Sequence, residues 1–146
     1  MSEDFKATNP KDQQATSRLD LTLWPDTATA YGALAMTEGH LKYGAYNWRA
    51  AGVQASVYVA ALRRHMAKWY NGEENDPKTG VPHLANALAC IAILVDAKEV
   101  NKLNDDRPPK GDMTELLNDF EKRVAELQGK FKNGPGRYRD EMGETK

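Results

Sequence analysis

The chain has 146 residues, of which 40% are hydrophobic and 28% are charged, and its formal net charge is -1. This length and composition predict one domain with a single hydrophobic core. A nearly neutral chain has no overall charge to attract nucleic acid or an anionic membrane, so neither is expected as a partner. The longest apolar run, residues 84–95, is about half the length that spans a bilayer, and no secretory signal follows Met1. With Cys90 as the single cysteine, these features predict a soluble cytoplasmic protein.

Residues 1–18 are polar and carry no periodic pattern, which predicts a flexible N-terminal arm. Residues 19–25 alternate like a strand but end at proline, so they form either a strand or an extended stretch laid across helices. A helix is expected to begin after Pro25, with Asp26 or Thr27 as its N-cap, and to end near Gly44. A loop over residues 44–49 is expected to follow.

Two further helices are predicted in the middle of the chain. Ser56 is the expected N-cap of the first, which runs to about Gly72. Turn-forming residues fill positions 72–81, and Pro82 fits the first turn of a helix that reaches roughly Lys98. This helix is apolar nearly all round, which predicts the buried centre of the domain, with Cys90 as a small buried hydrophobic residue.

A final amphipathic helix is predicted after a break over residues 104–111. Asp112 and Glu115 have the spacing of a capping box. The apolar residues that follow form a narrow stripe, typical of a seam with another helix of the same chain or of a second copy: Leu116, Phe120, Val124, Leu127 and Phe131. Residues 133–146 are predicted to be disordered. The sequence therefore predicts an all-α fold, a compact bundle of about four helices over residues 19–132, and a homo-oligomer.

Acidic and histidine side chains gather where the second and third long helices are expected to meet. His65 and Glu73 are spaced to lie on one helical face. If the loop folds back, a group of four can approach one point: Glu73, Glu74, Asp76 and His83. Oxygen-rich sites of this kind suit Mg²⁺ or Mn²⁺, and Glu38 on the first helix is a further candidate ligand. The alternative is a solvated acidic loop, with Glu38 as an ordinary surface residue.

A second group of side chains has the chemistry of a nucleotide site. Basic residues neutralise phosphates, aromatic rings stack on a base, and an amide can hydrogen-bond the base edge. The residues predicted to bind nucleotide are Lys42, Tyr46, Asn47, Trp48, Arg49, Arg64 and His65. The alternative is that Trp48 anchors the loop in the core and the arginines lie on the surface.

Other catalytic signatures are absent from the sequence. No serine lies in a glycine elbow, Cys90 has no obvious base, and there is no glycine-rich phosphate loop. Neither paired zinc-binding cysteines nor a His-Glu-x-x-His motif occurs. The lack of a His-Asp doublet argues against an HD-type phosphohydrolase.

Several short motifs, taken together, resemble one family. They are Glu38-Gly39, Lys42-Tyr43-Gly44, Tyr46-Asn47-Trp48-Arg49, Arg64-His65, Trp69, Gly72-Glu73-Glu74, Gly80, His83-Leu84 and Asp105-Asp106-Arg107-Pro108. Over about residues 20–108 the chain resembles the phage-associated dATP/dGTP diphosphohydrolase N-terminal domain family. It is also similar to the all-helical MazG-like pyrophosphohydrolases, although their E-E-x-x-E helix motif is reduced here to Glu38 and their E-x-x-D motif falls in an expected loop.

The resemblance implies hydrolysis of purine deoxynucleoside triphosphates to the monophosphate and pyrophosphate, in the host cytoplasm if the protein is phage-encoded. Under this interpretation Glu38, Glu73, Asp76 and His83 bind Mg²⁺ or Mn²⁺, while Glu74, with Glu73, orients or deprotonates the attacking water. The alternative is a non-catalytic helical module that binds a nucleotide or a protein and oligomerises through the apolar stripe.

Overall fold

The computed structural model describes residues 9–14 and 17–139. Residues 1–8 and 15–16 of the predicted arm and residues 140–146 of the predicted tail lie outside the described residues. Contacts divide the chain into two units, Met1–Arg107 and Pro108–Lys146. The boundary falls inside the range 19–132 predicted as one domain, at a Pro108-Pro109 pair that cannot continue regular structure.

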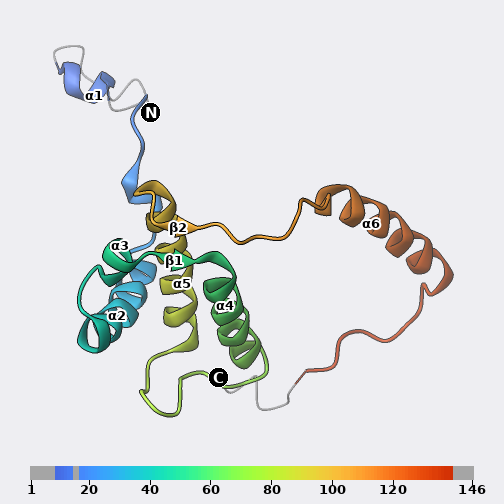
Figure 1. Ribbon diagram of the computed structural model, residues 1–146. Coiled ribbons are helices and arrows are strands. Elements are labelled where there is room, and N and C mark those ends of the chain that lie inside the picture. Colours follow the sequence, from blue (N-terminus) through green and yellow to red (C-terminus); the bar gives the residue numbers. More distant parts are fainter. Residues whose placement is uncertain (1–8, 15–16, 140–146) are drawn as a thin grey trace. The chain divides into compact units, whose positions relative to one another are not determined.

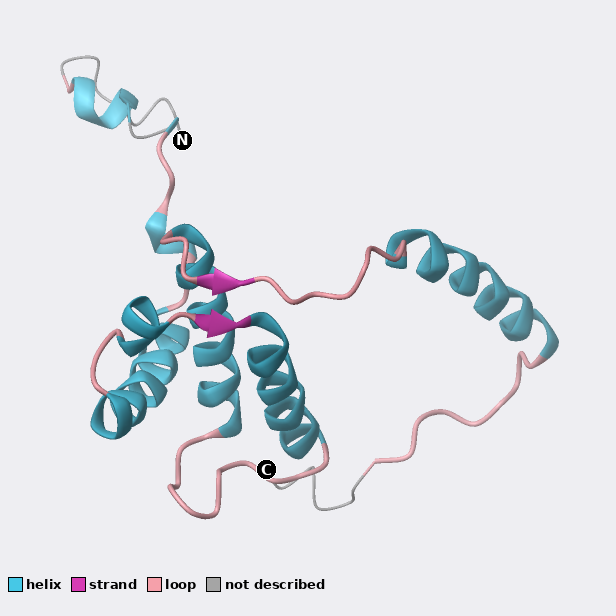
Figure 2. Cartoon of the chain, viewed as in Figure 1, coloured by secondary structure: helices cyan, strands magenta, loops and turns pink. Residues whose placement is uncertain are grey.

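The first unit is built mainly from helices (Figures 1 and 2), which confirms the predicted all-α fold. Its elements, in chain order, are α1 (Pro10–Gln14), η3 (Leu21–Leu23), α2 (Asp26–Tyr43), α3 (Asn47–Ala51), β1 (Val53–Gln54), α4 (Ala55–Tyr70), α5 (His83–Glu99) and β2 (Leu103–Asn104). The two short strands pair in parallel, with Val53 opposite Leu103. The second unit contains α6 (Met113–Lys130).

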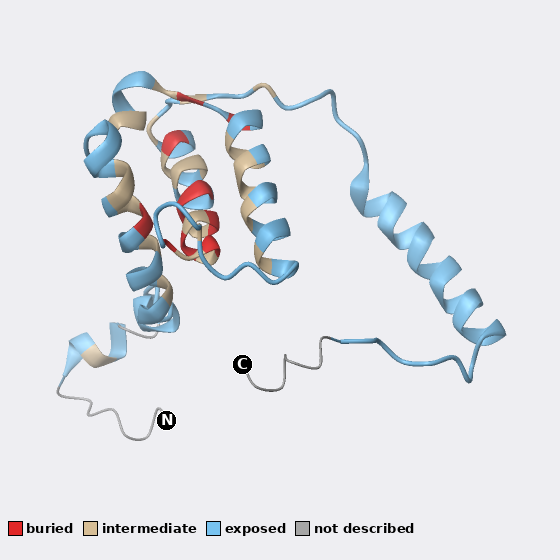
Figure 3. Cartoon of the chain, turned by 90° about the horizontal axis from the view of Figure 1, so that it is seen from below, coloured by how far each residue is buried: buried red, intermediate tan, exposed pale blue. Residues whose placement is uncertain are grey.

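Helix α5 is the centre of the first unit, as its apolar sequence predicts. It packs against both α2 and α4, and Figure 3 shows buried positions concentrated along it. Apart from His83 at its start, its buried residues are small, with Ala85 and Ala97 at 0% exposure, so neighbouring helices can approach closely. Cys90 is buried as predicted, and burial raises the pKa of its thiol.

The helix boundaries correct the sequence prediction in three places. Residues 21–23 form a short 3-10 helix rather than a strand, because the Asp20 carboxylate accepts the Thr22 amide at 2.9 Å and caps a turn. The expected loop over residues 44–49 instead contains the start of α3, which follows Tyr46 in the left-handed region at φ 56°. Helix α4 begins at Ala55, so Ser56 lies inside its first turn and is not the N-cap.

A distant aspartate supplies the cap that Ser56 was expected to provide. The carboxylate of Asp106 accepts hydrogen bonds from the amide of Ser56, at 2.8 Å, and from its hydroxyl. A helix start has unpaired amide groups, and a carboxylate placed there also favours the helix dipole. Asp106 therefore fastens the chain after β2 onto the beginning of α4.

Replacing Asp106 with alanine is expected to lower the melting temperature by a few degrees at neutral pH, because the first turn of α4 loses its acceptor. The hydrogen bonds from Ser56 hold the pKa of Asp106 below its ordinary value of 3.8. The contribution is therefore present above pH 3.8 and disappears as the pH falls through the lowered pKa. Thermal unfolding of both proteins across this range checks the prediction, and a difference that does not shrink in acid would contradict it.

Helix α6 begins as predicted. The Asp112 carboxylate accepts the Glu115 amide at 2.9 Å, which confirms the predicted N-cap. None of its residues is buried within the described part of the chain. Among the described residues, no helix is both long and apolar enough to cross a bilayer.

Candidate functional site

A cavity of about 490 Å³ lies between α2, α5 and the segment that joins α2 to α3. Its lining is Ala35, Met36, Gly39, His40, Tyr43, Gly44, Ala45, Tyr46, Asn47, Trp48, Arg49, Tyr58, Ala89, Ala92, Ile93 and Asp96. We call it the aromatic cavity. Its size is within the range of small-molecule sites, and its mix of apolar surface with a few polar groups is typical of them. Four of the predicted nucleotide-binding residues, positions 46–49, line it.

Asp96 organises one wall of the aromatic cavity. Its carboxylate accepts the Trp48 indole N–H at 2.7 Å and the Arg49 Nε and Nη2 groups, each at 2.8 Å. The hydrogen bonds from Arg49 and then Trp48 lower the pKa of Asp96 to about 2. Because a charged, bidentate pair has a fixed geometry, Asp96 holds both side chains in one arrangement.

Tyr46 completes this wall. Its ring centroid lies 5.1 Å from that of Trp48 at an interplanar angle of 38°, and the Arg49 guanidinium carbon lies 4.7 Å from the Tyr46 ring centroid. These are distances at which aromatic pairs and cation–π contacts are favourable. Trp48 therefore anchors its segment to α5, as the alternative interpretation proposed, and also lines the cavity.

Arg49 lines the aromatic cavity and pairs with Asp96, while its predicted contact with phosphate stays a prediction. Two of its donor groups are committed to Asp96, so it acts on the cavity as a positioning residue in this structure. Sequence reasoning did not identify Asp96. The sequence did contain a signal, because Asp96 is the first charged residue after the apolar run of α5. A carboxylate beside buried apolar surface needs a polar partner.

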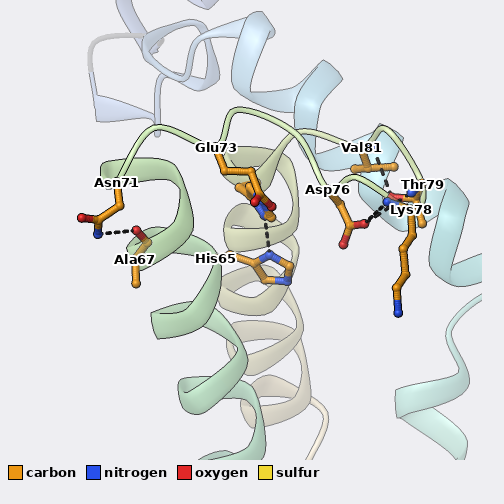
Figure 4. Close-up of polar contacts among 9 residues, drawn as sticks. His65, Ala67, Asn71, Glu73, Asp76, Lys78, Thr79 and Val81 are labelled. Carbon is orange, nitrogen blue, oxygen red and sulfur yellow. Dashed lines mark hydrogen bonds and ion pairs between the residues drawn. The ribbon is translucent and has the colours of Figure 1, made fainter. Parts of the chain in front are cut away.

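A second cluster, which we call the histidine junction, comprises His65, Glu73 and His83. His83 is 0% exposed at the start of α5. Its Nε2 lies 2.8 Å from a Glu73 carboxylate oxygen and its Nδ1 lies 3.0 Å from Nδ1 of His65. The contact between Glu73 and His83 agrees with the expected approach of these two residues, but Glu73 lies in the loop after α4 and does not share a helical face with His65. Figure 4 shows His65 reaching from α4 toward Glu73 in the loop.

These contacts determine the tautomers of the two histidines when Glu73 is ionised and both rings are neutral. A carboxylate only accepts, so Nε2 of His83 donates and its Nδ1 is the acceptor. Nδ1 of His65 must then donate, which leaves Nε2 of His65 as an acceptor. Burial, followed by the neighbouring His83, lowers the pKa of His65. The junction is thus a directed chain of hydrogen bonds from α4 to the loop before α5.

The predicted metal ligands do not form one centre in this structure. Glu38 pairs with Lys42 at 2.6 Å, and Asp76 accepts the amides of Lys78 and Thr79 at 2.8 and 3.3 Å, which shapes its own turn (Figure 4). Within residues 9–14 and 17–139, no three His, Cys, Asp or Glu side chains are grouped closely enough to hold a metal ion. Metal binding stays a prediction for the four expected ligands, Glu38, Glu73, Asp76 and His83.

Positive side chains lie near the histidine junction. Lys68 and Arg64 both contribute to the lowered pKa of His65. The Glu38 carboxylate raises the pKa of Lys42, and Asp76 adds a smaller contribution, so Lys42 is within electrostatic reach of the loop. Lys42 and Arg64 were predicted from the sequence, whereas Lys68 was not. Glu74 is exposed in the same loop, and its carbonyl accepts the His83 amide at 3.0 Å.

Comparison with known proteins gives one family. The family model described as "dATP/dGTP diphosphohydrolase, N-terminal" matches residues 8–107. No curated protein and no solved structure matches the chain. The matched range contains the aromatic cavity and the histidine junction and ends at Arg107, the last residue of the first unit. The chain therefore belongs to the dATP/dGTP diphosphohydrolase N-terminal domain family.

Proposed function

We propose that the protein binds a purine deoxynucleoside triphosphate and hydrolyses it to the monophosphate and pyrophosphate. The observation that carries this proposal is that the family match spans both the aromatic cavity and the histidine junction. The family description supplies the class of reaction. The aromatic cavity offers apolar surface for a base. The histidine junction offers polar groups, with positive side chains nearby, for phosphates.

The aromatic cavity is the proposed seat of the base. Its volume of about 490 Å³ suits a small ligand, and most of its lining is apolar. Tyr46 and Trp48 offer ring faces for stacking, a contact available to any base. The Asn47 side chain, also in the lining, has both a donor and an acceptor for the edge of a purine.

The histidine junction is the proposed seat of the phosphates. Ala89 of the cavity lies six residues after His83 in α5, which corresponds to about 9 Å along the helix axis. In the proposed arrangement, a nucleotide with its base in the cavity extends its phosphates toward the end of α5 at which the junction lies. Lys42, Arg64 and Lys68 would neutralise the phosphate charge there.

In the proposed reaction, water attacks the α-phosphorus and the bond from this phosphorus to the oxygen bridging to the β-phosphate breaks. Glu74 orients the water and accepts its proton, and pyrophosphate leaves. Glu73 holds His83, and through it His65, in one tautomeric arrangement. Dependence on Mg²⁺ or Mn²⁺ stays a prediction, and no step is assigned to a metal because its predicted ligands are not assembled.

The proposal is tested by incubating the full chain with dATP, dGTP, dCTP and dTTP in turn. Each reaction is run with Mg²⁺, with Mn²⁺ and with a chelator, and both the monophosphate and pyrophosphate are quantified. We expect equal amounts of the two products, formed fastest from the purine nucleotides. Nucleotide binding without product under every condition would refute hydrolysis and support the alternative, a non-catalytic binding module.

The role of Glu74 has its own prediction. Replacing Glu74 with glutamine keeps the size of the side chain but removes the base, so kcat should fall by roughly a hundredfold. Glu99→Gln, at the exposed end of α5, is the matched control and should retain full activity. Unchanged turnover in the Glu74 variant would assign the proton transfer elsewhere.

A further inference from the structure

Two partly buried polar side chains of the aromatic cavity are the Asn47 amide and the Tyr58 hydroxyl. Neither forms a hydrogen bond with the part of the chain that the structure describes, whereas Trp48 and Asp96, in the same lining, bond to each other. A polar group that is partly removed from water gains from a ligand that pairs with it. The proposed function gives Asn47 such a partner, the edge of the base, and gives none to Tyr58.

Tyr58 belongs to α4, yet it lines the cavity between α2 and α5. Helix α5 packs against both of the other helices and lies between them (Figure 1), so Tyr58 brings its side chain to the cavity from the side of α4. Burial, followed by the neighbouring Cys90 and Tyr43, raises the pKa of Tyr58 above its ordinary value of 10.0. The phenol therefore stays protonated at neutral pH and has an O–H group to donate.

The chemistry of the two purines limits which atom this donor can serve. Adenine and guanine carry opposite groups at position 6, an amino donor and a carbonyl acceptor, but both present the N7 acceptor, which pyrimidines lack. Their other shared acceptor, N3, adjoins the sugar, which in the proposed arrangement leads out of the cavity toward the phosphates. A single donor that serves both purines is therefore best placed at N7.

We infer that the Tyr58 hydroxyl donates a hydrogen bond to N7 of the bound base and so selects purines over pyrimidines. This inference rests on the proposed function, because it needs the base of the nucleotide in the aromatic cavity. A pyrimidine leaves the hydroxyl without an acceptor in a site that is partly closed to water, and sites built to form a hydrogen bond discriminate against ligands that lack the matching group.

Asn47 complements this contact. Its amide contains both a donor and an acceptor, so it can pair with the base edge on which adenine and guanine differ. Tyr58 then recognises what the two purines share, and Asn47 adapts to what distinguishes them. One cavity can accept dATP and dGTP in this way without a separate set of contacts for each.

Calorimetric titration of the full chain with α,β-methylene dGTP and its 7-deaza form tests the inference. The 7-deaza form has a C–H group in place of N7, so it loses the acceptor and keeps the shape of the base. The wild type should bind the 7-deaza form about tenfold more weakly. Tyr58→Phe keeps the ring and removes the hydroxyl, so it should bind both forms with the same, weaker affinity. The corresponding pair of dATP analogues should behave in the same way.

Tyr70→Phe is the matched control, because Tyr70 ends the same helix, is 73% exposed and does not line the cavity. This variant should retain the tenfold difference. Equal affinities of the wild type for the two dGTP forms, or a difference that persists in Tyr58→Phe, would overturn the inference. So would an effect confined to the dGTP analogues, which would place the hydroxyl at O6. These outcomes leave the proposed function standing, whereas the absence of binding by all four analogues would refute both.

Discussion

Replacing Asp96 with asparagine should weaken the binding of dGTP by about tenfold or more. One carboxylate accepts hydrogen bonds from Trp48 and from two groups of Arg49. An asparagine keeps one acceptor oxygen and turns an N–H₂ group toward donors that need an acceptor. The wall of the aromatic cavity then loses its fixed geometry, although Asp96 itself has no assigned contact with the base. Calorimetric titration with a non-hydrolysable dGTP analogue measures the effect.

Asp105→Asn is the matched control for this experiment. Asp105 forms the same kind of bidentate pair, with Arg107 at 2.7 and 2.6 Å, and this pair also lowers the pKa of Asp105 to about 2. Neither residue lines the aromatic cavity, so the control should bind the analogue like the wild type. Equal affinities for the wild type and the Asp96 variant would show that the cavity is not the base site.

Replacing His83 with alanine should lower the free energy of unfolding by about 3 kcal/mol. The side chain is 0% exposed, so its removal leaves a cavity at the start of α5. It also removes the hydrogen-bond partner of both Glu73 and His65. Urea unfolding followed by circular dichroism gives the value.

The exposed His40→Ala variant is the control, and its free energy of unfolding should change by less than about 0.5 kcal/mol. If the His83→Ala chain does not fold well enough to measure, His83→Gln, which retains a donor and an acceptor, should be intermediate. An effect of His83→Ala no larger than that of His40→Ala would contradict the structural role of the histidine junction.

Much of the fold follows from patterns that are local in the sequence. The three long helices of the first unit, the central position of α5 and the Asp112 cap of α6 come from apolar periodicity and capping residues. The start of α4 could not be predicted in this way. Its cap comes from Asp106, fifty residues after Ser56, and a partner at that distance leaves no local signal.

The sequence predicted which residues form the candidate site, but not which residues they contact. Motif spacing identified the segment 46–49 and the residues of the histidine junction. It did not show that Arg49 is committed to Asp96, because that contact depends on how α3 packs on α5. The acidic residues predicted to share a metal ion do not meet in the structure. Glu38 pairs with Lys42, and Asp76 accepts the amides of its own turn, from Lys78 and Thr79.

The indole N–H signals in a ¹H–¹⁵N NMR titration test whether a purine nucleotide occupies the aromatic cavity. The chain has three tryptophans, and of these only Trp48 lines the cavity in the described part of the chain. On addition of α,β-methylene dGTP, the Trp48 signal should move the most, while that of Trp24, which donates to Thr29, should stay in place. Assignment by Trp48→Phe identifies the signal. A stationary Trp48 signal at saturating nucleotide would show that the nucleotide does not bind in the aromatic cavity.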